Sequence, residues 1–121
     1  MSDDSALPKS SANIRRPRRT AGDRLREALL TLSEHHGQVI DHREKAWASI
    51  TFAGTRHTVS LLFTGEEAAE AGERFVATLP DHEFDIPGQL VADAGVSTCE
   101  HRLLPSPRLA VTCELLLLEE A

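Results

Sequence analysis

Two short stretches decide the expected fold: Gly37-Gln38-Val39-Ile40-Asp41 and Gly88-Gln89-Leu90-Val91-Ala92-Asp93. Each follows a segment with helical periodicity, and each precedes two further runs that alternate as strands do. The near-repeat predicts two similar units side by side, in the order αβββαβββ. Chance similarity between two amphipathic strands is the competing explanation of the match.

Both helices are indicated by capping residues and apolar spacing. Thr20 with Asp23 has the spacing of a capping box, and Gly37 suits the position just past the end of the first helix. Thr64 with Glu67 repeats the capping signal for a second helix. The buried stripe expected on that helix consists of Ala68, Ala71, Phe75 and Leu79.

The first hairpin is predicted from alternation and turn chemistry. Residues 46–52 and 57–63 alternate, and Gly54-Thr55 suits a two-residue turn with Gly at its first central position. This register places Trp47 opposite Leu62 on the face of the sheet that points away from the helices.

The last hairpin is predicted to pair residues 95–103 with residues 108–118. Of the two possible pairings, one places charged residues in the core, and the other is favoured because it keeps them out. The favoured pairing puts Cys99 across from Cys113 and His101 across from Val111.

These elements predict an α+β fold, a two-layer sandwich with one antiparallel sheet and both helices on one face. We expect residues 21–121 to form this single domain. Residues 1–20 are rich in Ser, Asp, Pro and Arg and predict a disordered basic tail. The sequence shows no secretory signal and no apolar run long enough to cross a bilayer, so we expect a cytoplasmic protein that contacts no membrane and has free thiols.

The net charge of the chain is −6 although its first residues are basic, so the body is strongly acidic. Such a body repels nucleic acid, and any contact with it must come from the tail. Four arginines on the tail form a candidate tether that would contact the phosphates of nucleic acid without sequence specificity. The alternatives are a solubilising tail or one that folds against the acidic body. The four are Arg15, Arg16, Arg18 and Arg19.

The leading functional hypothesis is a non-enzymatic protein-binding or regulatory module. A two-layer fold leaves one sheet face open, and apolar side chains clustered there are typical of a partner interface. We expect a homodimer, or an unidentified protein partner, on this face. The candidate interface residues are Trp47, Leu62, Leu116 and Leu118.

A third hypothesis is a metal- or thiol-dependent enzyme that uses Cys99, His101 and Cys113, since three soft ligands on one strand face can begin a zinc site. The alternative is that the two cysteines are small apolar residues of the core and that His101 is a hydrogen-bonded neighbour with no role in catalysis. His42 lies in an expected polar turn with Asp41, where metal binding would be adventitious. The sequence contains no phosphate-binding loop or nucleophile motif, so no cofactor is predicted.

Overall fold

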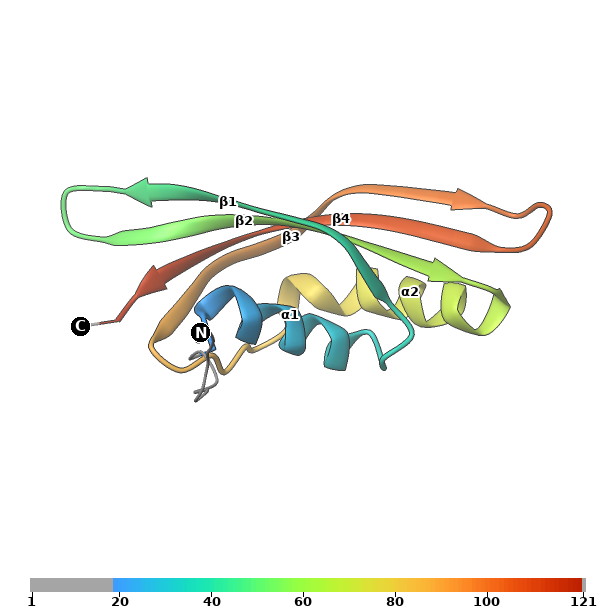
Figure 1. Ribbon diagram of the computed structural model, residues 1–121, viewed down its shortest axis with the longest axis horizontal. Helices are drawn as coiled ribbons and strands as arrows, with labels where there is room; N and C mark the ends of the chain where they lie inside the picture. The colour runs from blue at the N-terminus through green and yellow to red at the C-terminus, as the bar shows by residue number, and fades with distance from the viewer. Residues whose placement is uncertain (1–18, 121) are drawn as a thin grey trace, which may run out of the picture.

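The computed structural model describes residues 19–120, which form a four-stranded antiparallel sheet covered on one face by two helices (Figure 1). The α+β two-layer prediction is therefore confirmed. The strand order is β1-β2-β4-β3, so the two hairpins join through β2 and β4. The elements are α1 (Ala21–Leu32), β1 (Gln38–Ala48), β2 (Ala53–Thr64), α2 (Glu66–Thr78), the 3-10 helix η2 (Leu79–Asp81), β3 (Gln89–Arg102) and β4 (Arg108–Glu119).

The order αββαββ corrects the predicted αβββαβββ, and the proposed pseudo-repeat is not confirmed. The two expected short strands are the first residues of β1 and β3, which continue for 11 and 14 residues. The polar stretch 42–45, expected to be a turn, lies inside β1. An edge strand tolerates such charges because one side of it faces water.

The turn of the first hairpin lies at residues 49–52, before the predicted Gly54-Thr55. The Ser49 N–H donates to the Phe52 carbonyl at 2.8 Å, and the Phe52 N–H donates to Ser49 Oγ at 3.1 Å. Gly54 lies within β2, where a Cβ would come 2.1 Å from the Leu117 carbonyl oxygen. The glycine allows close approach of backbones. The predicted pairing of Trp47 with Leu62 is wrong, because Trp47 pairs with Gly54.

The second hairpin is shifted by two residues from its predicted register. Cys99 pairs with Val111 and His101 with Leu109, while Cys113 pairs with Val96. The connection spans 103–107, which includes two prolines that lack the N–H a ladder requires. A shift of two keeps Cys99 and His101 on the predicted face, but it separates the two cysteines along the sheet.

Helix α1 ends earlier than predicted. Its C-cap is Ser33, and the left-handed residues beyond it are Glu34 (φ 59°) and His35 (φ 61°), in place of Gly37. Ser33 Oγ donates to the Leu30 carbonyl at 2.7 Å and accepts the Gly37 N–H at 3.3 Å. The buried serine thus supplies the hydrogen bonds that let the chain leave the helix early.

Helix α2 begins after Gly65, which makes no side-chain cap, so the predicted Thr64 capping box is wrong. The predicted buried stripe on its sheet-facing side is confirmed. At Gly72 a Cβ would lie 2.6 Å from Leu109 Cδ2 and 2.8 Å from Phe63 Cγ, so the helix rests directly on β2 and β4. The core between the layers contains Leu25, Leu29, Val59, Leu61, Phe63, Phe75, Leu79, Leu109, Val111, Cys113, Leu115 and Leu117. Neither described helix is long and apolar enough to span a bilayer.

Candidate functional site

The outer face, defined as the side of the sheet that points away from the helices, carries all four predicted interface residues. Trp47 pairs with Gly54, Gly54 with Leu118, and Leu118 with Leu90, which forms one row across all four strands. Leu116 lies in the next row. Leu62 lies apart from them, between Gln38 and Ala110 toward the other end of β2. The structure therefore brings three of the predicted residues together.

This apolar row is packed within the single chain and still presents surface to solvent. Leu118 is only 8% exposed, because its Cδ2 fills the space above Gly54, 3.0 Å from the position a Cβ would take. Trp47 is half-buried, and Leu90 is 51% exposed. Leu90 was not among the predicted interface residues, although alternation within Gln89–Arg102 places it on the outer face.

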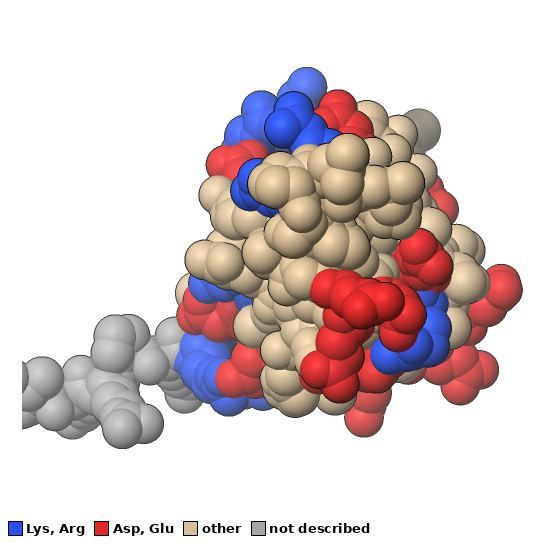
Figure 2. All heavy atoms as spheres, turned by 90° about the vertical axis from the view of Figure 1, so that its right-hand side faces the viewer, with Lys and Arg blue, Asp and Glu red and all other residues tan. Residues whose placement is uncertain are grey.

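Charges on the outer face are nearly balanced, in contrast to the acidic body. Five basic and four acidic side chains occupy its outward positions, while the whole chain has a net charge of −6. The acidic excess lies elsewhere, and Figure 2 shows acidic side chains gathered over the helical layer, where α2 exposes four glutamates. The outward charged residues of the sheet are Arg43, Lys45, Arg56, Arg102, Arg108, Asp41, Asp93, Glu100 and Glu114.

Basic residues oppose each other in two cross-strand pairs on this face. Lys45 pairs with Arg56, and Arg102 with Arg108. Like charges directly opposite each other destabilise a sheet. None of the four forms an ion pair with another described residue. Within residues 19–120, these two basic pairs therefore have no ion-pair partner.

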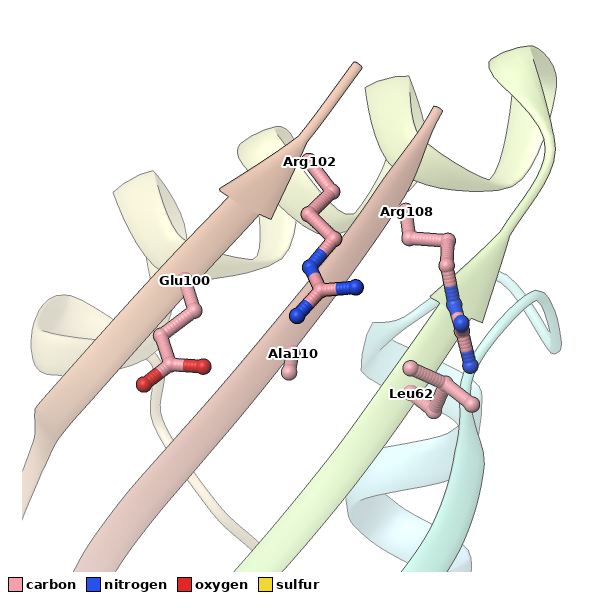
Figure 3. Close-up of a pocket in the computed structure, with 5 residues that line it drawn as sticks. All are labelled: Leu62, Glu100, Arg102, Arg108 and Ala110. Carbon is pink, nitrogen blue, oxygen red and sulfur yellow. The ribbon is translucent and has the colours of Figure 1, made fainter. Parts of the chain in front are cut away.

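A shallow hollow of about 220 Å³ lies at the second of these pairs. Figure 3 shows the guanidinium groups of Arg102 and Arg108 above a floor formed by Leu62 and Ala110, with Glu100 to one side. Two guanidinium groups over an apolar floor form a site suited to a carboxylate attached to an apolar group.

Both edges of the sheet are interrupted by bulges. β1 shifts register between Val39 and Asp41, and β3 does so between Val91 and Asp93 and again between Val96 and Thr98. Bulges and charged residues on edge strands discourage pairing with another strand. Association through the edges is therefore disfavoured, which leaves the outer face as the broad surface available to a partner.

The predicted group of Cys99, His101 and Cys113 does not come together. Cys113 is buried, its Sγ donates to the Val59 carbonyl at 3.4 Å, and burial raises the pKa of its thiol to about 12. Cys99 is exposed, and His101 Nδ1 lies 3.9 Å from Glu73 Oε2 on α2. A thiol that stays protonated at neutral pH is a poor nucleophile and ligand.

The two thiols are expected to differ sharply in reactivity. In the native protein a thiol reagent at pH 8 should modify Cys99 rapidly, and Cys113 should react only after unfolding in denaturant. A Cys99→Ser variant, used as the control, should show almost no reactive thiol until it is unfolded. Fast reaction of two thiols in the folded protein would contradict the burial of Cys113.

Three of the four arginines predicted to form the tether lie outside the described residues, namely Arg15, Arg16 and Arg18. Arg19 is described, and its guanidinium forms an ion pair with Glu27 of α1. The end of the predicted tail thus contacts the acidic body at this point.

A chain of polar side chains links α1 to the sheet on its helix-covered side. Arg26 forms an ion pair with Asp23, and its Nη1 donates to His42 Nδ1 at 2.6 Å. His42 Nε2 and His57 Nδ1 are 2.9 Å apart. Burial lowers the pKa of both imidazoles, and the Arg26 charge lowers that of His42 further. The sequence did not predict this cluster, because the first hairpin turn was expected at Gly54-Thr55 and His42 in a separate polar turn, whereas His42 lies within β1.

Comparisons of this chain with protein-family models, with curated proteins and with solved structures find no match.

Proposed function

We propose that this protein is a non-enzymatic protein-binding module that forms a homodimer through the outer face of its sheet. The row of Trp47, Leu118 and Leu90 carries the proposal, because it crosses the sheet within a surface of balanced charge. Aromatic and apolar residues at the centre of an interface supply most of its binding free energy.

Charge favours this face over the rest of the surface. The remainder of the molecule is strongly acidic, so two copies approaching through their helical layers repel each other. On the outer face both signs are present, and one copy can offer carboxylates to the basic pairs of the other. The hollow at Arg102 and Arg108 suits such a carboxylate. A second copy can therefore supply a carboxylate to these two arginines, which form no ion pair within residues 19–120.

Sedimentation equilibrium of the full chain tests this proposal, and we expect the mass of a dimer. Leu90→Glu should weaken the dimer about tenfold or more, because it places a carboxylate within the apolar row. The control is Leu103→Glu, which alters an exposed leucine (67%) in the β3–β4 connection and should leave the dissociation constant unchanged. A wild-type mass that stays monomeric at high micromolar concentration would refute the proposal, as would equal weakening by both variants.

A further inference from the structure

Three potential metal ligands face one another on the helix-covered side of β1 and β2. The donor atoms of His42, Glu44 and His57 all lie within 4.8 Å of one another. His42 and Glu44 alternate on β1, and Glu44 pairs with His57 on β2, so the hairpin register holds all three. The cluster lies on the opposite side of the sheet from the proposed interface.

Two imidazole nitrogens with a carboxylate oxygen form a donor set that Zn²⁺ uses, leaving one position open for water. The two nitrogens are 2.9 Å apart, and two Zn–N bonds of about 2.0–2.1 Å span that separation with little movement. His57 is 1% exposed, whereas Glu44 is exposed on the edge strand. An ion can therefore enter from the Glu44 side and be held against a buried imidazole.

We propose that His42, Glu44 and His57 form a binding site for a divalent transition metal, with Zn²⁺ as the best-suited ion.

Arg26 competes with the ion for His42. A guanidinium can only donate, so His42 Nδ1 accepts from it and the His42 proton lies on Nε2, the atom that faces His57. In this tautomer His42 Nε2 has no free lone pair for a metal. Binding requires Arg26 to leave, after which His42 carries its proton on Nδ1 and offers Nε2 to the ion. Asp23, already paired with Arg26, can retain the guanidinium.

Metal binding therefore acts on the contact between α1 and the sheet. The first turn of α1 lies against the same carboxylate, since a Cβ on Gly22 would be 2.8 Å from Glu44 Oε2. When His42 and Glu44 bind the ion, the Arg26–His42 hydrogen bond is lost. The capping box of Thr20 and Asp23 at the start of α1 is retained. The site is thereby coupled to the position of the helix.

Zinc titration of the untagged full chain by calorimetry, with Co²⁺ absorption as a second readout, tests the site. We expect one ion per chain and the visible spectrum of four-coordinate Co²⁺. His42→Gln and Glu44→Gln should each weaken binding about tenfold or more. Arg26→Met should tighten it, because the competing donor is removed. His82→Gln, which alters an exposed histidine in another loop, should leave it unchanged.

Several results would overturn the inference. One is the absence of saturable zinc binding. Another is an equal loss of zinc affinity in His42→Gln and His82→Gln. A third is a lower zinc affinity in Arg26→Met. Because a substitution of buried His57 can unfold the chain, the test uses His42 and Glu44, with circular dichroism of each variant to verify folding. The outcome is independent of the dimer, whose surface lies on the other side of the sheet.

Discussion

Phe63→Ala is expected to lower the free energy of unfolding by about 3–5 kcal/mol, the usual cost of truncating a buried aromatic side chain. Phe63 is fully buried at the end of β2, and its ring centroid lies 5.9 Å from that of Phe75 on α2. Two glycines, Gly37 and Gly72, lie close against the ring. Alanine would leave a cavity between the layers that neither glycine can fill.

Urea denaturation followed by circular dichroism measures this loss. Phe52→Ala is the matched control, because Phe52 is 51% exposed in the first turn, and its removal should cost well under 1 kcal/mol. Both variants must be compared at one protein concentration, since dimer formation contributes to apparent stability. Similar losses for the two variants would show that Phe63 does not anchor α2 to the sheet.

Gly54→Ala is expected to destabilise the fold by about 3 kcal/mol, at the upper end of the range for overpacking. The new methyl group would lie 2.1 Å from the Leu117 carbonyl oxygen and 3.0 Å from Leu118 Cδ2. Backbone atoms cannot move aside as a flexible side chain can, so β2 and β4 must separate locally.

The control for this variant is Gly95→Ala in β3, where no described residue other than the two chain neighbours comes within 4 Å of the added methyl group. We expect Gly95→Ala to change the midpoint of thermal unfolding by no more than a few degrees and Gly54→Ala to lower it much further. If the two variants unfold at similar temperatures, the close approach of β2 and β4 at Gly54 is not a feature of the protein.

The spacing of apolar residues predicted the two layers of the fold, but it did not predict how the strands pair within each hairpin. The apolar stripe of α2 and the alternation of β4 identify core residues directly, because each side chain's face follows from its spacing. The turn at 49–52 carries no glycine or proline, whereas Gly54 resembles a turn residue and serves a close contact instead. Bulges in β1 and β3 change parity within a strand and leave no reliable mark in the sequence.

The wrong hairpin registers also explain which residues of the candidate sites the sequence did not predict. Leu116 and Leu118 follow from the alternation of β4, and Trp47 reached the outer face although its predicted partner was wrong. The His42–His57 contact required the correct register, in which Trp47 pairs with Gly54, eight residues from its predicted partner Leu62. Arg102 and Arg108 required the true length of the second connection before they could be placed opposite each other.

Acrylamide quenching of Trp47 across a dilution series tests the proposed dimer most directly, because Trp47 is the only tryptophan of the chain and lies in the apolar row that crosses the outer face. A dimer that buries the outer face should protect the indole strongly at high protein concentration, and quenching should rise on dilution with the same midpoint as the change in sedimentation mass. Quenching that stays constant while the mass falls from dimer to monomer would contradict it, because the two copies would then associate through another surface.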